Sequence, residues 1–264
     1  MSRKATIYDI AKALNITAAT VSRALNDNPR ISADTRKLVM ETAAKLHYKQ
    51  NRLAQALKSG KSKNVGVVLP YINRNFFSTV IRGIEEELNP VGYHVIICQT
   101  HEDEKKEIDT VQNLLNAQVD GILISISLQT KHTDHFEQVL RKNVPLIFFD
   151  RKMDIEGVSS VTLDDYQGAY KATRHLIEQG CSKIAHLTVD RSLEIYQDRF
   201  DGYKQALEEH NIGLNMEYVI GLKSDIEAGK GAAKKLMELG NPPDAIFSST
   251  DLGALGAIQY LRGN

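Results

Sequence analysis

The residues Thr6–Asn26, TIYDIAKALNITAATVSRALN, decide the first part of the fold, because they predict two short helices joined by a tight turn. The hydroxyl of Thr6 can cap the first helix while Asp9, three residues later, reaches back to the free backbone amides. Asn15 is expected to end this helix, since Asn tolerates the left-handed backbone conformation. Thr17 can cap the second helix. The spacing therefore predicts a helix-turn-helix unit.

Each predicted helix has one apolar face and one small, polar face. The apolar positions at helical spacing are Ile7, Ile10, Ala11 and Leu14 in the first helix and Val21, Ala24 and Leu25 in the second. Ala18, Ala19, Ser22 and Arg23 remain on the outside of the second helix. Small side chains with a hydroxyl and a guanidinium suit close approach to a nucleic-acid groove. The alternative is a helical hairpin that is only part of a core, because such hairpins are common.

A third helix and an uneven distribution of charge favour the nucleic-acid interpretation. The helix is expected to start at Ser32 and to close a three-helix unit with Leu38, Val39, Ala43 and Leu46. Residues 1–63 contain 13 Lys or Arg and 4 Asp or Glu, a charge of +9, so the remaining 20 basic and 29 acidic residues carry −9. The neutral chain is thus a basic head on an acidic body, and a basic head is typical of nucleic-acid binding.

The segment Thr6–Leu57 resembles the DNA-binding head and hinge of the LacI/GalR (lactose-repressor) family. That family's signature, T-I-x-D-[VI]-A followed by T-V-S-R-x-L-N, is reproduced here by Thr6, Ile7, Asp9, Ile10 and Ala11 and then by Thr20, Val21, Ser22, Arg23, Leu25 and Asn26. Asn15 departs from the family's usual Gly at the turn. The resemblance implies a helix-turn-helix head at residues 1–50 and a hinge at residues 51–63. It also implies a transcription regulator, expected to be a repressor, that binds a pseudo-palindromic operator in double-stranded DNA as a homodimer.

The resemblance also assigns roles in DNA binding to individual residues. Phosphates or nearby edges are expected to be contacted by Thr6, Tyr8, Thr20, Ser22, Arg23 and Asn26, with Arg30 in the same set, whereas Thr17, Ala18 and Ala19 are expected to face the bases. Two alanines indicate apolar contact with thymine methyl groups in place of bidentate hydrogen bonds. Sequence specificity is then expected to depend mainly on the hinge and on DNA shape.

Residues 47–64, HYKQNRLAQALKSGKSKN, have the composition of a linker. Asn51–Leu57 can form about two helical turns, and helices this short are marginal without a partner. The resemblance implies a hinge helix that pairs with its twin in the minor groove, with Leu57 as the wedge between base pairs. The expected DNA contacts of the hinge are Asn51, Ala54, Gln55, Leu57 and Lys58. The alternative for Leu57 is an ordinary helical leucine that packs on the body. Gly60–Ser62 is not a phosphate-binding loop, since Gln55 stands where the first glycine is needed.

From Val65 onward, short apolar runs alternate with amphipathic stretches. The predicted strands are Val65–Leu69, His94–Cys98, Gly121–Ile126, Leu146–Phe149, Ile184–Val189 and Ala245–Phe247, and the predicted helices are Ser78–Leu88, Lys105–Ala117, Tyr166–Glu178, Arg199–His210 and Ala228–Leu239. Nearly continuous Val, Ile and Leu predicts strands that are covered on both faces. The expected fold class is therefore α/β, with a doubly wound parallel sheet. Two lobes are expected, residues 64–160 and 161–264, with a crossing near residues 157–164, and this body resembles the periplasmic-binding-protein fold that the family carries.

Ligands of such sheets bind beyond the carboxyl ends of the strands. The polar and aromatic residues at those ends are Asn73, Phe76, Phe77, Ser125, Ser127, Asp150, Arg151, Asp190, Arg191, Arg199, Thr250 and Asp251. They fit a small polar effector, such as a sugar or a derivative of one. The alternative for each is a loop residue that caps a helix.

The family resemblance narrows the expected effector contacts to Phe77, Ser125, Asp150, Arg199 and Thr250, with Asp251 beside them. Thr250 departs from the family's usual Asn. Ser224 stands where some members have an aromatic lid. The resemblance therefore implies an effector between the two lobes without identifying it.

Other classes of function receive little support. The chain has no G-x-S-x-G or G-x-G-x-x-G motif, so neither an α/β hydrolase nor a dinucleotide enzyme is expected, and no cofactor is predicted. His132, Asp134 and His135 are explained as a solvated helix start and not as metal ligands. The sequence contains no run of about 18 apolar residues and no secretory signal, so the protein is expected in the cytoplasm. Cys98 and Cys181 are accordingly expected to be reduced.

Two alternatives from other classes remain open: a sugar-binding module whose basic head contacts nucleic acid without sequence selection, and an enzyme on the same α/β body. The chain ends at Asn264, shortly after STDLGALGAIQYL, which in the resembling family opens a helix well before the second lobe ends. The second lobe is therefore expected to be incomplete, with unpaired strand edges.

Overall fold

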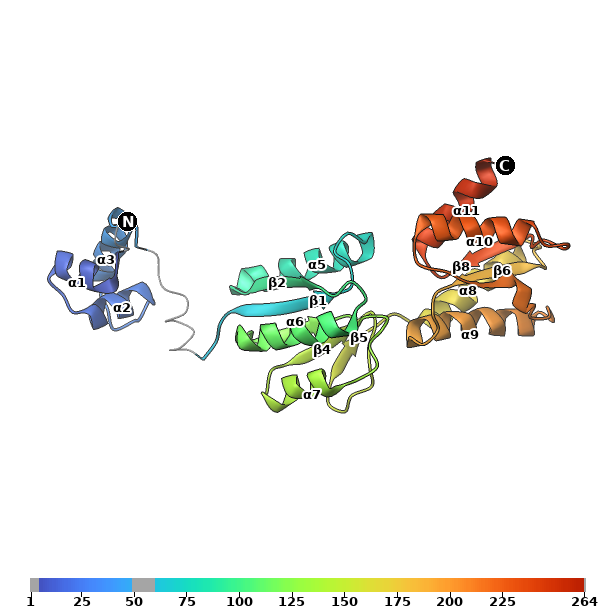
Figure 1. Ribbon diagram of the computed structural model, residues 1–264. Coiled ribbons are helices and arrows are strands. Elements are labelled where there is room, and N and C mark those ends of the chain that lie inside the picture. Colours follow the sequence, from blue (N-terminus) through green and yellow to red (C-terminus); the bar gives the residue numbers. More distant parts are fainter. Residues whose placement is uncertain (1–4, 49–59, 264) are drawn as a thin grey trace. The chain divides into compact units, whose positions relative to one another are not determined.

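The computed structural model describes residues 5–48 and 60–263, and the chain divides into two compact units, Met1–Ser62 and Lys63–Asn264 (Figure 1). The described part of the first unit, the head, consists of helices α1 (Ile7–Leu14), α2 (Ala18–Leu25) and α3 (Ala33–Lys45). The second unit, the body, contains two parallel sheets, and we refer to the part around each sheet as a lobe.

Local capping sets the limits of the head helices. The backbone N–H of Thr6 donates to Asp9 Oδ2 at 2.8 Å, so the predicted capping interaction is present. Asn15 ends α1 with φ 52° and ψ 42°, the left-handed conformation. Thr17 Oγ1 accepts a hydrogen bond from the backbone N–H of Thr20 at 3.1 Å and caps α2. The helix-turn-helix predicted from these residues is confirmed.

The core of the head is smaller than the sequence pattern predicts. Ile10, Val21 and Val39 are fully buried, and small alanines pack around them. Leu38 and Leu46 were expected to close the unit, but they are 51% and 38% exposed, so this prediction is wrong. Short helices bury only a narrow stripe, and neighbouring residues point about 100° apart on a helix. Val39 occupies that stripe, and its neighbour Leu38 therefore faces outward.

The first lobe is built on a five-stranded sheet with strand order β2-β1-β3-β4-β5, all parallel. Its elements are β1 (Asn64–Leu69), α5 (Asn75–Leu88), the short 3₁₀ helix η1 (Asn89–Val91), β2 (His94–Gln99), α6 (Glu104–Asn116), β3 (Gly121–Ile124), α7 (Asp134–Arg141), β4 (Leu146–Phe149) and β5 (Ser159–Val161). Along β1, Val67 and Leu69 pack with Phe77 of α5, whereas Val68 packs with Leu114 of α6. Side chains alternate between the faces of a strand, so this sheet is covered by helices on both sides.

The second lobe repeats this plan with a smaller sheet of order β7-β6-β8, also parallel. Its elements are α8 (Asp165–Glu178), β6 (Ile184–Thr188), α9 (Glu194–Glu209), the 3₁₀ helix η2 (Met216–Tyr218), β7 (Val219–Gly221), α10 (Ile226–Met237), β8 (Ala245–Ser248) and α11 (Asp251–Gly263). Ile184 of β6 packs with Tyr203 of α9 on one face, and Leu187 packs with Leu236 of α10 on the other. Helices accordingly lie on both faces of this sheet (Figure 1). The predicted α/β class and parallel topology are confirmed.

The boundaries of several elements differ from the prediction. β3 ends at Ile124 and not at Ile126, because the backbone beyond it turns toward polar partners. α9 starts at Glu194, five residues before the predicted start at Arg199, since its first turn carries buried apolar side chains. The predicted elements did not include β5 and β7, and of α7 only a helix start near His132–His135 was anticipated. These elements are short, and periodicity is a weak signal over so few residues.

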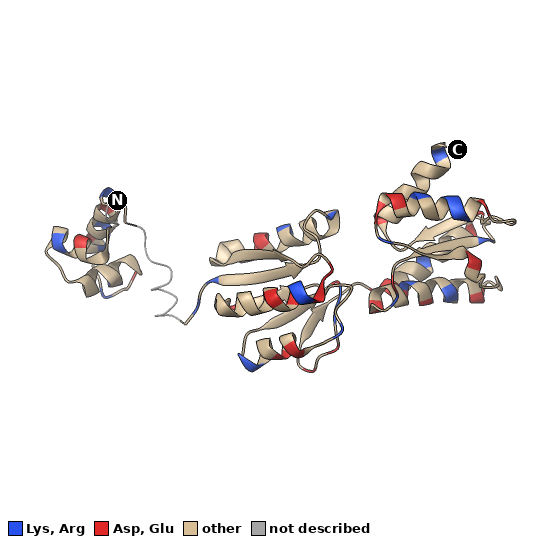
Figure 2. Ribbon diagram, in the orientation of Figure 1, with Lys and Arg blue, Asp and Glu red and all other residues tan. Residues whose placement is uncertain are grey.

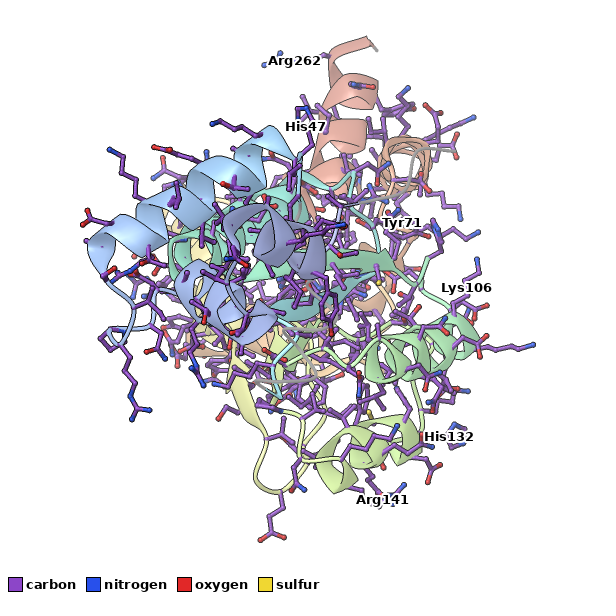
Figure 3. All side chains as sticks on the ribbon, turned by 90° about the vertical axis from the view of Figure 1, so that its left-hand side faces the viewer. His47, Tyr71, Lys106, His132, Arg141 and Arg262 are labelled. Carbon is purple, nitrogen blue, oxygen red and sulfur yellow. The ribbon has the colours of Figure 1, made fainter. Side chains whose placement is uncertain are left out.

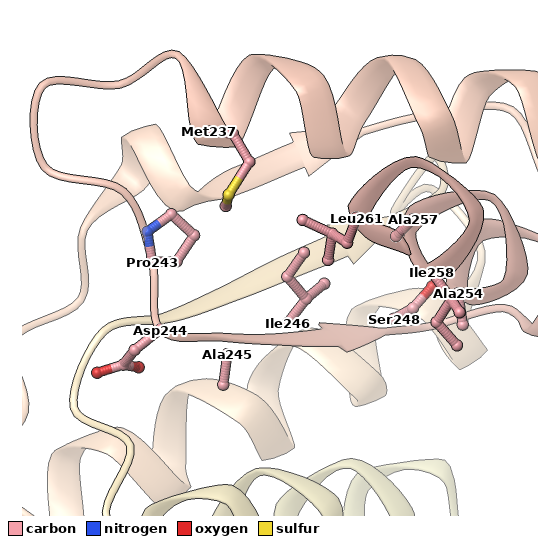
Figure 4. Close-up of a pocket in the computed structure, with 10 residues that line it drawn as sticks. All are labelled: Met237, Pro243, Asp244, Ala245, Ile246, Ser248, Ala254, Ala257, Ile258 and Leu261. Carbon is pink, nitrogen blue, oxygen red and sulfur yellow. The ribbon is translucent and has the colours of Figure 1, made fainter. Parts of the chain in front are cut away.

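An apolar groove of about 440 Å³ lies along β8 between α11 and the end of α10 (Figure 4). Its walls are mostly aliphatic, including Met237, Ile246, Ile258 and Leu261. Such a lining offers few hydrogen bonds, so the groove does not suit the small polar effector expected from the sequence. Among the described helices, none is long and apolar enough to cross a membrane.

Candidate nucleic-acid interface and effector site

The exposed face of α2 is the candidate DNA-reading surface. Thr17, Ala19 and Arg23 are exposed, whereas Thr20 and Ser22 are half-buried. Ala18 packs partly against the core of the head, so only part of its methyl group is accessible. The helix thus presents a shallow surface of methyl and hydroxyl groups with a guanidinium at its C-terminal end. Such a surface can approach base edges closely.

The other predicted contacts surround this helix. Tyr8 on α1 is 71% exposed, and Arg30 is exposed in the loop before α3. The side chain of Asn26 donates to the carbonyl oxygen of Ser22 at 2.7 Å, which fixes the end of α2. Thr6 is half-buried, and its hydroxyl donates to Asp9 Oδ2 at 2.7 Å. The lysines and arginines of the head lie on all three helices (Figure 2). The hinge contacts Asn51, Ala54, Gln55, Leu57 and Lys58 lie outside the described residues.

In the first lobe, the structure brings Ser125 and Asp150 together. Ser125 is buried directly after β3, and its hydroxyl donates to Asp150 Oδ2 at 3.3 Å. Asp150 follows β4 with φ 60°, a left-handed conformation that turns the chain sharply. Burial raises the pKa of the Asp150 carboxyl, although the nearby charges of Arg151 and Arg199 oppose this shift. The pair can accept and donate hydrogen bonds to a hydroxylated molecule.

In the second lobe, Arg199 is held in a fixed position. Its Nε and Nη2 donate to Asp165 Oδ1 at 2.8 and 2.7 Å, and its Nη1 donates to the carbonyl oxygen of Ser249 at 2.6 Å. Thr250 accepts a hydrogen bond from the backbone N–H of Gly253 at 3.3 Å, and exposed Asp251 is the first residue of α11. Thr250 therefore behaves as the helix-capping alternative predicts, while Arg199 is a preorganised donor.

Phe77 does not present its ring to solvent. It is buried among the residues of the first lobe, with its ring centroid 6.3 Å from that of Phe149. The neighbouring Phe76 is 44% exposed, and the two rings meet edge to face at 5.3 Å. Phe76, which the family resemblance did not select, is therefore the aromatic surface that can cover a ligand, and Phe77 supports it.

Three glutamates at the start of α6, which the sequence analysis did not single out, hold the loop between β3 and α7. Glu107 is fully buried and accepts from the backbone N–H of Ser127 at 2.6 Å. Glu102 and Glu104 accept from backbone N–H groups of the same loop at 2.7 to 2.8 Å. The loop that carries Ser125 and Ser127 is thereby fixed to α6. Glutamates in the first turn of a helix are usually solvated, so the sequence carried no signal of this role.

The same network corrects the prediction for His135. His135 was expected to lie at a solvated helix start, but it is only 3% exposed, and its Nε2 lies 3.0 Å from Glu107 Oε1. His132, in contrast, is exposed at the outer surface (Figure 3). Across the part of the chain that the structure describes, no group of three or more His, Cys, Asp or Glu side chains could hold a metal ion. The buried contact with Glu107 arises because α7 docks its apolar face on the sheet, and His135 goes with it.

Arg151 is a second residue whose partners could not be read from the sequence. It is 8% exposed, and its Nη1 donates to both carboxylate oxygens of Glu102, at 2.8 and 3.0 Å. Its Nη2 donates to Tyr196 Oη on α9 at 3.3 Å. Arg151 is thus occupied in joining the lobes, and it is not a free donor for a ligand.

Comparison with known protein families agrees with this arrangement. Residues 62–264 match the periplasmic binding proteins and sugar binding domain of LacI family, and residues 6–51 match the bacterial regulatory proteins of the lacI family. This chain belongs to the LacI family. It is 34% identical over 255 residues to catabolite control protein A of Priestia megaterium, and this alignment covers 96% of this chain and 76% of that protein. It is 30% identical over 254 residues to the ribose operon repressor of Halalkalibacterium halodurans, covering 96% of this chain and 74% of that repressor.

Solved structures show the same architecture. The structure of the lac repressor dimer bound to operator and the anti-inducer ONPF matches with a TM-score of 0.86, covering 99% of this chain and 78% of that chain. The identity is 24%, so this likeness establishes the LacI-family fold alone. The LacI-family chain described here spans about three quarters of the length of the curated relatives it matches.

Membership of the LacI family establishes the class of function. The chain is a DNA-binding transcription regulator with a helix-turn-helix domain and a domain of the sugar-binding type. Its relatives are transcription regulators and not enzymes, which removes the enzyme alternative left open by the sequence.

Proposed function

We propose that this LacI-family regulator is a repressor that binds a pseudo-palindromic operator in double-stranded DNA as a homodimer. The observation that carries the proposal is the exposure of Ala19 and Arg23 on α2 and of its N-cap Thr17, in the basic N-terminal part of the chain, where residues 1–63 carry a charge of +9. A dimer presents this face twice, and two-fold symmetry of the protein is mirrored in its site. Because the protein binds operator DNA, it acts in the cytoplasm.

The division of labour on the DNA follows from side-chain chemistry. Arg23 and Arg30 offer charge to phosphates and fix the position of the head, while Ala18 and Ala19 lie against thymine methyl groups. Thr6, Tyr8, Thr20, Ser22 and Asn26 add polar contacts to the backbone. The domain limits that accompany this proposal are 1–50 for the head, 51–63 for the hinge, 64–160 for the first lobe and 161–264 for the second.

The effector proposed for the body is a small hydroxylated molecule, of the class of sugars and sugar derivatives. Ser125 with Asp150 in the first lobe and Arg199 in the second supply donors and acceptors at the carboxyl ends of the strands, where ligands of such sheets bind. Phe77, Thr250 and Asp251 belong to the same proposed site. Among structural relatives, the regulator CelR is seen in a complex with cellobiose, which supports this class of effector.

Selection of random double-stranded DNA on the purified chain, near physiological salt, tests the proposal. A retained motif with two-fold symmetry is the expected result. Retention without any motif would contradict the repressor proposal and would favour a sugar-binding module with non-specific nucleic-acid contact. An Ala19→Gln variant provides the internal control, because a longer polar side chain on the reading face should change the selected sequence without abolishing retention.

A further inference from the structure

Two separate sets of contacts join the lobes of the body. The first set combines a buried pair, Arg151 and Tyr196, with a more exposed ion pair, Lys152 and Glu194. Arg151 Nη2 donates to Tyr196 Oη at 3.3 Å, and Lys152 Nζ lies 2.9 Å from Glu194 Oε2. Tyr196 also packs in the same apolar cluster as Ile126 of the first lobe. These contacts attach the first turn of α9 to the first lobe, so this region of the body behaves as one piece.

The second set is a hydrogen bond between two loops. Arg74 lies between β1 and α5, and its Nη2 donates to the backbone carbonyl oxygen of Ser224 at 2.9 Å. Ser224 lies in the loop between β7 and α10. The guanidinium carbon of Arg74 lies 5.5 Å from the ring centroid of Tyr71, which restricts the orientation of the guanidinium. Both loops follow the carboxyl ends of strands, as the proposed effector residues do.

The two sets differ in what their loss would cost. Breaking the contact of Arg151 with Tyr196 separates groups that are both less than 10% exposed and disturbs a shared apolar cluster. Arg74 is half-buried and its partner is a single carbonyl oxygen, so water can replace the lost hydrogen bond on both sides. The lobes therefore separate more readily at Arg74 than at Arg151.

We propose that the hydrogen bond from Arg74 to Ser224 is a latch that holds the lobes closed at the strand ends, and that the contacts of Arg151 and Lys152 form the pivot about which the lobes open. This inference rests on the proposed effector function, because the latch then controls entry to and exit from the effector site. The acceptor is a main-chain oxygen, so the latch depends on Arg74 and not on the side chain at position 224.

Hydrogen–deuterium exchange of the full chain without any effector tests the latch. In an Arg74→Ala variant, the amides of residues 71–76 and 222–226 should exchange about fivefold to tenfold faster, as expected for loss of a charge-assisted hydrogen bond. Exchange in residues 193–197, at the pivot formed with Arg151 and Lys152, should not change. Arg82→Ala is the matched control, because Arg82 is a nearby arginine on α5 and pairs only weakly, at 3.8 Å, with Glu86. Arg74→Lys should be intermediate, since it keeps the charge but loses the planar donor group.

A distance measurement separates lobe opening from a purely local effect. Spin labels at the exposed positions Gln138 on α7 and Lys235 on α10 report the separation of the lobes, with Cys98 and Cys181 replaced by alanine. Arg74→Ala should broaden the distance distribution toward longer values, and Arg82→Ala should not. Unchanged exchange, or faster exchange with an unchanged distance distribution, would overturn the latch. Neither measurement uses an effector, so failure of the effector proposal would be recognised separately.

Discussion

Arg23 and Ala19 lie on the same exposed face of α2, but their side chains act on different parts of a DNA site. A guanidinium interacts with phosphates, which are the same in every sequence, and it contributes through the release of counterions. A methyl group contacts base edges, which differ between sequences. Affinity and specificity are therefore expected to be separable at neighbouring residues of one short helix.

Replacing Arg23 with alanine should weaken binding to all DNA sequences and make the dependence of log K on log salt shallower by about one. The measurement is a titration of operator and random DNA at several salt concentrations. Arg82→Ala, in the body, serves as the control and should leave both affinity and slope unchanged. An Arg23→Ala variant with the wild-type slope would show that this residue makes no phosphate contact.

His186 makes the stability of the second lobe depend on pH. It is fully buried on β6 and packs against the rings of Tyr203 and Phe247, whose centroids each lie 4.9 Å from its own. Burial lowers the pKa of His186 from 6.5 to about 4. Between these values the unfolded chain takes up a proton that the folded protein does not accept. The contribution of neutral His186 to the free energy of unfolding is thus fully present above pH 6.5 and is lost as the pH falls toward 4.

Urea unfolding of the wild type and of His186→Phe between pH 7.5 and 4.5 measures this contribution. Over the full titration, the free energy of unfolding of the wild type should fall by up to about 3 kcal/mol more than that of the variant. The comparison between the two proteins cancels the titration of carboxylates, which is common to both. Parallel pH profiles would contradict the assignment.

At the scale of elements, close contacts between helices determine how the second lobe is assembled. A Cβ atom on Gly202 of α9 would overlap the carbonyl oxygen of Tyr166 and lie 2.9 Å from the backbone nitrogen of Tyr170. α8 and α9 can therefore approach only where α9 carries a glycine. Gly256 of α11 has the same role against α10, where a Cβ atom would lie 2.9 Å from the backbone nitrogen of Lys230.

Gly202→Ala should destabilise the protein by about 1–3 kcal/mol, because the neighbouring atoms are backbone and cannot move aside without shifting a helix. Gly168→Ala is the matched control on α8, where a Cβ atom would meet nothing within 4 Å. There the substitution should stabilise the helix by up to about 1 kcal/mol. Chemical unfolding of both variants checks the prediction, and equal effects would contradict the proposed close packing.

At the scale of the whole molecule, a basic head and an acidic body must communicate through residues 51–63. An effector can change DNA binding only if it binds the two states of the regulator unequally. The two lobes provide such states, because an effector between them favours closure.

Thermodynamic linkage gives a test at this scale. If a sugar changes operator affinity by a given factor, operator DNA should change the affinity for that sugar by the same factor. Calorimetric titration with cellobiose or ribose, with and without saturating operator, measures this reciprocity. A sugar that binds equally well in both conditions would not be a regulatory effector.

The LacI-family head could be predicted almost completely, because its determinants lie close together along the chain. Capping by Thr6 and Thr17 and the left-handed turn at Asn15 involve partners within four residues. The alternation of buried strands and amphipathic helices likewise predicted the α/β body. Local hydrogen bonds and periodicity can be read from sequence, since they do not depend on the rest of the fold.

The buried polar partners could not be read in this way. Glu107 and His135 are 28 residues apart, and Arg151 and Tyr196 are 45 apart, so these contacts exist only once the lobes have formed. The exposure of Leu38 and the burial of Phe77 similarly depend on which neighbours the fold supplies. The family, the helix-turn-helix and the parallel α/β plan follow from the order of residues alone. Which charged side chains are buried depends on the three-dimensional fold, because desolvation and pairing involve groups that the fold brings together from distant positions.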